Sequence, residues 1–129
     1  MKKILIVEDN KLIASVYQSK LRNEGFDIEV AADGETGLQF LSKSSPDLIL
    51  LDLVLPKLSG ADFLTKVRQD PQWAQLPVIV FTQTHSPDLL QAAWKAGATQ
   101  VLSKATSTPK EIIETIKKAV NPPSSSVQP

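Results

Sequence analysis

The stretch that decides the fold is Asp47-Leu48-Ile49-Leu50-Leu51-Asp52, in which four consecutive large aliphatic residues lie between two aspartates. A short, continuous apolar run of this kind is typical of a strand that is buried on both faces, as in a parallel sheet. Four other short apolar runs, most of them also continuous, occupy residues 4–7, 28–31, 78–82 and 101–103. The sequence therefore predicts five strands of one parallel sheet.

Longer stretches with helical spacing separate these runs. The first extends from about residue 11 to residue 24, with Ile13, Tyr17 and Leu21 four residues apart and Gly25 at its end. The second begins after Asp33-Gly34, and the other three open with residues that commonly cap helices, namely Ser59, Ser86-Pro87 and Thr108-Pro109. We therefore expect five helices that alternate with the five strands.

Parallel strands linked through helices form a sheet that is covered on both faces, and right-handed crossovers leave few topologies. We expect an α/β, doubly wound five-stranded parallel sheet of order 2-1-3-4-5, with a flavodoxin-like arrangement and a ligand site at the carboxyl ends of strands 1 and 3. One domain is predicted over residues 1–121. Residues 122–129, rich in Pro and Ser, are predicted to be a linker or disordered tail.

The composition excludes several classes of site. The 129 residues include no cysteine, so there is no disulfide framework, thiolate zinc site or cysteine nucleophile, and the single histidine, His85, excludes a multi-histidine metal site. Fourteen basic residues balance fourteen acidic ones, and no glycine-rich phosphate loop is present. The missing loop argues against nucleotide binding, and the basic residues are scattered, so direct nucleic-acid binding by this domain has little support. No apolar run approaches the roughly 20 residues that span a bilayer, and we expect a cytoplasmic protein with no membrane contact.

Polar residues stand at the ends of four predicted strands. Glu8 and Asp9 follow the first, Asp52 follows the third, Thr82 ends the fourth and Lys104 follows the fifth. Because these strand ends share one edge of the sheet, the three carboxylates are expected to meet there and repel. Each pair costs about 4 kcal/mol at ~4 Å and an effective dielectric near 20. A hard divalent cation such as Mg²⁺ offsets this repulsion, and the whole set suits phosphoryl transfer to a nucleophilic carboxylate.

Each of these residues also has an ordinary structural interpretation. Glu8-Asp9 is compatible with a polar turn before a helix, Thr82 with a common strand residue and Lys104 with a surface lysine. Asp52 is harder to explain in this way, because it ends a fully apolar strand. The joint placement at four strand ends favours a functional site.

These residues resemble the receiver domain of two-component response regulators, the CheY-like family, over roughly residues 2–120. The matching segments are residues 4–10, residues 47–56 with Gly60 after them, residues 78–82, residues 96–98 and Lys104. The resemblance implies that Asp52 is the phosphoacceptor, that Lys104 pairs with a phosphoryl oxygen and that Thr82 is a switch hydroxyl. It further implies a Mg²⁺ ion held by Asp9 and Asp52 directly, by Glu8 through water and by the backbone carbonyl of Val54.

The resemblance also implies partners. The phosphoryl donor would be a histidine kinase or a histidine phosphotransfer protein, and the signal would pass by a conformational switch to a downstream protein partner or effector domain. A homodimer through the fourth helix, fifth strand and fifth helix is a further expectation. In this interpretation the protein is a signalling module and not an enzyme, apart from self-catalysed phosphotransfer and dephosphorylation.

Three positions depart from the family pattern. Gln83 is bulky where the family usually has a small residue, Val101 replaces an aromatic residue, and Ala105 replaces a proline. The last change makes a cis peptide before it costly, by ~2.5–4 kcal/mol. These departures keep open an alternative, a receiver-like interaction module that acts without phosphorylation. A flavodoxin-like FMN binder is also compatible with the fold, although the acidic site repels phosphate unless a metal intervenes.

Overall fold

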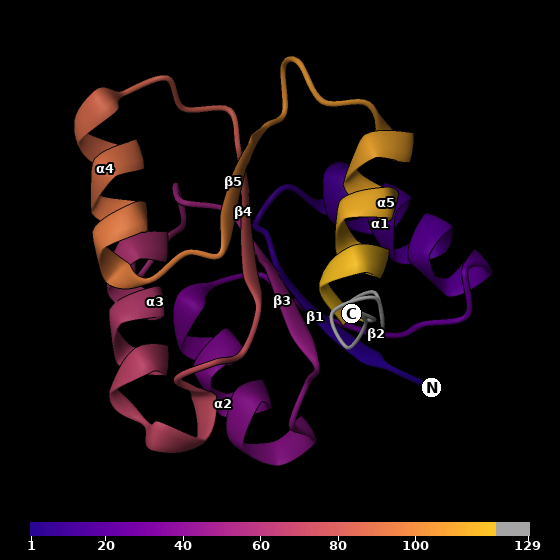
Figure 1. Ribbon diagram of the computed structural model, residues 1–129, viewed down its shortest axis with the longest axis horizontal. Coiled ribbons are helices and arrows are strands. Elements are labelled where there is room, and N and C mark those ends of the chain that lie inside the picture. Colours follow the sequence, from indigo (N-terminus) through magenta and orange to yellow (C-terminus); the bar gives the residue numbers. More distant parts are fainter. Residues whose placement is uncertain (121–129) are drawn as a thin grey trace, which may run out of the picture.

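The computed structural model describes residues 1–120 and contains one five-stranded sheet with helices on both faces (Figure 1). The strands are β1 (Lys3–Val7), β2 (Asp27–Ala31), β3 (Leu48–Leu51), β4 (Val78–Thr82) and β5 (Gln100–Ser103). They pair in parallel in the order β2-β1-β3-β4-β5, which confirms the predicted topology. Residue 121, the predicted end of the domain, and the predicted tail at 122–129 lie outside the described residues.

Five helices alternate with the strands, as the sequence predicts. They are α1 (Lys11–Asn23), α2 (Gly34–Ser44), α3 (Gly60–Gln69), α4 (Pro87–Ala96) and α5 (Pro109–Val120), and a short 3₁₀ helix, η1 (Pro71–Trp73), follows α3. Within residues 1–120, none of these helices combines the length and the apolar character that crossing a bilayer requires.

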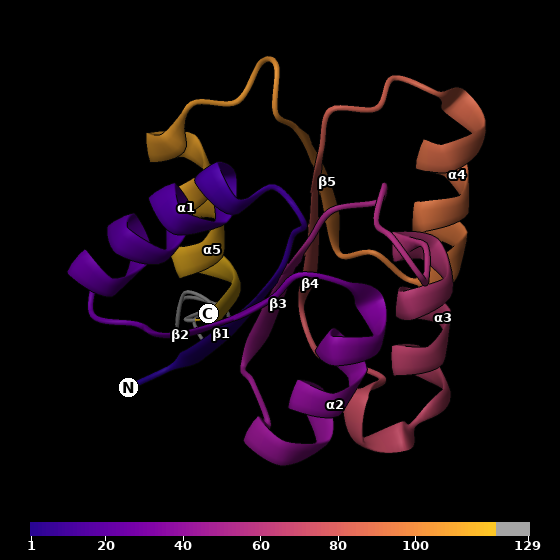
Figure 2. The ribbon, with the colours of Figure 1, turned by 180° about the vertical axis from the view of Figure 1, so that it is seen from behind.

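The helices form two layers, with α1 and α5 on one face of the sheet and α2, α3 and α4 on the other (Figures 1 and 2). Alternate strand residues serve the two layers. In β1, Ile4 and Ile6 pack with α1 and α5, whereas Leu5 and Val7 pack with the opposite layer. Both faces are therefore buried, which is the physical reason that the strand sequences are continuously apolar.

Capping hydrogen bonds fix where α3 and α5 begin, and so where the loops before them end. The Ser59 Oγ accepts a hydrogen bond from the Asp62 N–H at 3.2 Å. At the start of α5, Thr108 and Glu111 form a reciprocal capping box at 3.2 and 2.8 Å, as their spacing predicts. The hydrogen bond from the Thr108 backbone N–H lowers the pKa of the Glu111 carboxyl.

The loop between β3 and α3 folds back tightly onto the end of β3. Gly60, the first residue of α3, donates its N–H to the carbonyl of Leu53 at 2.9 Å. A Cβ at this position would lie 2.6 Å from the Leu53 Cα and closer still to the backbone oxygen of Asp52. Only glycine permits this approach, so Gly60 helps to fix the backbone that carries Asp52.

Gly60→Ala is expected to lower the free energy of unfolding by about 2–3 kcal/mol, because backbone atoms have to move to admit the methyl group. Thr65→Ala, at an exposed position of the same helix, is the control and is expected to change stability by no more than ~0.5 kcal/mol. Urea unfolding measures both. A Gly60→Ala variant as stable as the control would contradict the close approach.

Candidate functional site

The five residues that the sequence places at strand ends meet at the carboxyl edge of the sheet. Together they line a hollow of about 490 Å³. Other residues complete its wall: Asn10, Ile13, Val54, Gln83 and Thr84. The predicted residues therefore share one site.

Lys104 lies at the centre of this site. Its ammonium donates hydrogen bonds to Glu8 Oε1 at 2.6 Å and to Asp52 Oδ2 at 3.1 Å. The side chains of all three residues are buried, with 4–9% of their surface exposed. Lys104 is thus not a surface lysine, and its bonds to two buried carboxylates are of the strong, charge-assisted type.

The charges of this cluster depend on one another. Burial raises the pKa of Glu8 and the neighbouring charge of Asp52 adds to this effect, and they outweigh the opposing hydrogen bonds from Lys104 and from the backbone of Asn10. For Lys104, burial lowers the pKa, but the bond to Glu8 and the charge of Asp52 outweigh it and the pKa is raised. Lys104 therefore stays protonated while the site as a whole keeps an excess of carboxylate groups.

Three carboxylates are close enough to hold one cation. Oxygen atoms of Glu8, Asp9 and Asp52 lie within 4.8 Å of one another. Asp9 lines the hollow and is exposed, whereas Glu8 and Asp52 are buried. Among residues 1–120, the other oxygen of Asp52, Oδ1, accepts only a long hydrogen bond of 3.4 Å, from the Val54 N–H. An all-oxygen set of this kind fits a hard divalent ion such as Mg²⁺.

Thr82 connects the site to α4 through a chain of hydrogen bonds. Its Oγ1 accepts from the Thr84 N–H at 3.3 Å, and the Thr84 Oγ1 accepts from the Ser86 N–H at 3.2 Å. The Ser86 Oγ in turn accepts from the Leu89 N–H in the first turn of α4, at 3.3 Å. His85 lies exposed in the same loop and does not line the main hollow.

The three departures from the family pattern have separate structural consequences. Gln83 is exposed and lines the hollow. Val101 lines a second hollow of about 170 Å³, which Thr82 and Leu90 also line. The Lys104–Ala105 peptide is trans, like every peptide bond that the structure describes. The N–H of Ala105 donates to Ser103 Oγ at 3.1 Å, a bond that a proline could not make.

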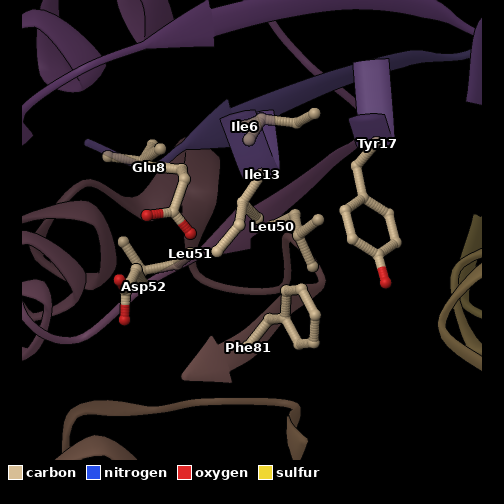
Figure 3. A pocket seen from close by; sticks show the side chains of 9 residues that line it. Ile6, Glu8, Ile13, Tyr17, Leu50, Leu51, Asp52 and Phe81 are labelled. Atoms are coloured by element: carbon tan, nitrogen blue, oxygen red, sulfur yellow. The ribbon is translucent and has the colours of Figure 1, made fainter. Parts of the chain in front are cut away.

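One residue of the site, Phe81, was not predicted. The Lys104 Nζ lies over its ring, 5.7 Å from the centroid. The ring of Tyr17 meets Phe81 edge to face, and in Figure 3 both rings line a small pocket with Glu8 and Asp52 on its far side. Strand alternation could have indicated Phe81. It places the residue before Thr82 on the other face of β4, and this is the face on which Lys104 reaches the site.

The chain matches known proteins over most of its length. Residues 4–117 match the response regulator receiver domain. The alkaline phosphatase synthesis transcriptional regulatory protein PhoP of Bacillus subtilis is 34% identical over 116 residues, which cover 90% of this chain and 47% of that protein. This chain thus spans about half the length of that relative.

Two solved structures show the same likeness. A CheY-like receiver domain protein from Methanospirillum hungatei has a TM-score of 0.87 at 28% identity, with 93% of this chain and 94% of the other covered. The Mn²⁺-bound form of response regulator Rcp1 has a TM-score of 0.79 at 29% identity, with 92% and 93% covered.

Lys104→Met is expected to lower the free energy of unfolding at neutral pH by about 3 kcal/mol in metal-free buffer, because buried carboxylates lose their counter-charge. The pKa of Glu8, already raised by burial, should rise further. A group whose pKa is raised on folding stabilises the fold at low pH and loses that contribution as the pH rises. The deficit should therefore shrink as the pH falls toward 4.5, the ordinary pKa of a glutamate.

Lys117→Met is the matched control. Its ammonium pairs with Glu24 at 2.5 Å, but both side chains are substantially exposed, at 50% and 34%. Removing an exposed pair should cost less than ~1 kcal/mol at either pH. Denaturant unfolding at neutral pH and near pH 4.5 measures the free energy of unfolding of both variants. A loss of stability in Lys104→Met that does not depend on pH would contradict the proposed charge balance.

Proposed function

This chain belongs to the response regulator receiver domain family, and we propose that Asp52 is the residue on which it accepts a phosphoryl group in signal transduction. The observation that carries this proposal is the position of Asp52, which lies buried at the base of the hollow with Oδ2 held 3.1 Å from the Lys104 ammonium. A carboxylate placed in this way is oriented for attack, and the Lys104 ammonium beside it can offset the negative charge of phosphoryl oxygens.

In the transfer step, an oxygen of the Asp52 carboxylate attacks the phosphorus of a phosphohistidine. The new bond joins this oxygen to phosphorus, and the phosphorus–nitrogen bond breaks. Its electron pair stays on the imidazole nitrogen, which takes up a proton. The Lys104 ammonium exchanges a hydrogen bond to a carboxylate oxygen for one to a phosphoryl oxygen, so that its positive charge offsets the negative charge that arrives.

The phosphoryl group is then removed by hydrolysis, in which water is the co-reactant. A water oxygen attacks the phosphorus, the bond between phosphorus and Asp52 breaks, and inorganic phosphate leaves with the Asp52 carboxylate restored. The hollow in front of Asp52 is large enough to admit water. This self-catalysed loss resets the module.

We propose that Glu8, Asp9, Asp52 and the backbone carbonyl of Val54 hold Mg²⁺. When bound, the ion supplies positive charge that neutralises phosphoryl oxygens during transfer. The proximity of the three carboxylates supports this assignment, as does the description of Rcp1, a similar protein, as Mn²⁺-bound. Thr82, whose hydroxyl lies beside the hollow, is proposed to follow the phosphoryl group and to pass the change to the loop before α4.

The partners follow from the same proposal. The donor is a histidine kinase or a histidine phosphotransfer protein, and the reaction takes place in the cytoplasm. The output passes to a downstream protein partner or effector domain, and homodimerisation through α4, β5 and α5 is one route. PhoP is described as a transcriptional regulatory protein, which supports control of transcription as an output. DNA contact would then belong to a partner or effector domain and not to this one.

Incubation of the wild type with acetyl phosphate and Mg²⁺ is expected to produce one phosphorylated species, detected by intact-protein mass spectrometry. Asp52→Asn should give none, because an amide oxygen is a poor nucleophile. Omission of Mg²⁺ should suppress the wild-type reaction as well. A wild type that stays unmodified in the presence of Mg²⁺ would refute the proposed function.

Asp62→Asn is the matched control, because Asp62 is an exposed carboxylate on α3 outside the hollow. The Asp62→Asn variant should be phosphorylated at the wild-type rate.

Phosphorylation of the Asp9→Asn variant should be slower at limiting Mg²⁺. Saturation with the ion should restore part of the rate, since Asp9 is assigned to the metal and not to the nucleophile.

A further inference from the structure

The ammonium of Lys104 has an aromatic neighbour in addition to its two carboxylates. Its Nζ lies over the Phe81 ring at 5.7 Å from the centroid, within the ~6 Å at which a ring face attracts a cation. Phe81 is 5% exposed, so little water competes for this position. The attraction is strongest in such surroundings, because the cation has already lost part of its hydration.

The strand register brings the two residues together. Phe81 of β4 pairs with Leu102 of β5, and both side chains pack on the face covered by α1 and α5. Lys104 lies two residues beyond Leu102, and its N–H donates to the carbonyl of Thr82 at 2.9 Å, which extends the parallel pairing. Strand alternation therefore sends the Lys104 side chain out on the same face as Phe81. To reach Glu8 and Asp52 from β5, the lysine has to cross β4 over this ring.

A second ring restrains the first. The Tyr17 ring from α1 meets the Phe81 ring edge to face, with centroids 5.2 Å apart and planes at 74°. In Figure 3 the two rings flank Leu50, with Glu8 and Asp52 on the far side of the same small pocket. That pocket has a volume of only about 10 Å³, room for one water molecule at most. The Phe81 ring therefore has little freedom to tilt.

We propose that Phe81 is a positioning residue. Its ring holds the Lys104 ammonium at the phosphoacceptor and leaves the positive charge of the ammonium uncompensated. The ring attracts the ammonium but offers no hydrogen-bond acceptor and no negative charge that would compete with a phosphoryl oxygen. Lys104 can then exchange a carboxylate for the incoming group while it stays in place. This inference rests on the proposed roles of Asp52 and Lys104.

The test replaces Phe81 alone with mono-, tri- and pentafluorophenylalanine. Fluorine withdraws electron density from the ring face, and ring size changes little. The initial rate of Asp52 phosphorylation by acetyl phosphate at saturating Mg²⁺ is expected to fall stepwise, by roughly three- to tenfold over the series. Phe81→Leu should be as slow as the pentafluoro variant, whereas Phe81→Tyr, which keeps the ring, should recover most of the rate.

The same fluorinated residues at Phe63 provide the control. Phe63 is fully buried in the opposite layer, so fluorination there perturbs packing without touching Lys104. Its phosphorylation rate should stay at the wild-type value. A rate that falls equally at both positions would overturn the proposal, because it would reflect general damage to the core.

A measurement without metal or phosphoryl donor checks the geometry directly. In the metal-free protein, the ring current of Phe81 should shift the Lys104 side-chain proton resonances upfield of those of other lysines, and Phe81→Leu should remove this shift. Normal phosphorylation throughout the Phe81 series, or the absence of the shift, would overturn this inference and leave the function of Asp52 intact. A wild type that is not phosphorylated would instead overturn the proposed function and this inference with it.

Discussion

The ion pairing of one lysine with two buried carboxylates is the constraint on which the site depends. Glu8 and Asp52 follow neighbouring strands, and the Asp52 N–H still bonds to the Val7 carbonyl at 3.0 Å. Their proximity is thus imposed by the pairing of β1 with β3. Lys104 follows β5, which β4 separates from β3, and only a long, flexible side chain can span β4 to reach them. The order of the strands therefore dictates both the repulsion and the residue that offsets it.

The rest of the fold keeps the members of this group at fixed positions. Residues buried on both faces of the sheet hold the strands, and the close approach of Gly60 to the end of β3 holds the backbone around Asp52. The Phe81 and Tyr17 rings fill the space under Lys104. Asp9, by contrast, is exposed where it lines the hollow. Packed support below and an exposed residue above are the combination that the proposed transfer from a protein donor requires.

The sequence was sufficient to predict the fold and the meeting of five polar residues at one edge of the sheet, for identifiable physical reasons. Double burial leaves continuous apolar runs, capping residues mark helix starts, and parallel pairing brings strand ends to one edge. What could not be predicted was how side chains cross between strands. In the sequence alone, Lys104 is compatible with a surface lysine, because the sequence does not show that its side chain turns inward over Phe81. The short helix η1 also escaped prediction, since three residues are too few for a periodic pattern.

The link from Thr82 to α4 differs in kind from the packed core. Thr82, Thr84 and Ser86 each use one hydroxyl to hold one backbone N–H further along the chain, and the last of these belongs to Leu89 in α4. The three hydrogen bonds are arranged in series. A packed core spreads a local disturbance over many contacts, so the effect of losing any single contact is diluted. In the series from Thr82 to α4, only the last step is doubled, because the Ser86 carbonyl also accepts from the Leu90 N–H at 3.0 Å. The two steps before it depend on one hydroxyl each, so the loss of either hydroxyl interrupts the whole connection.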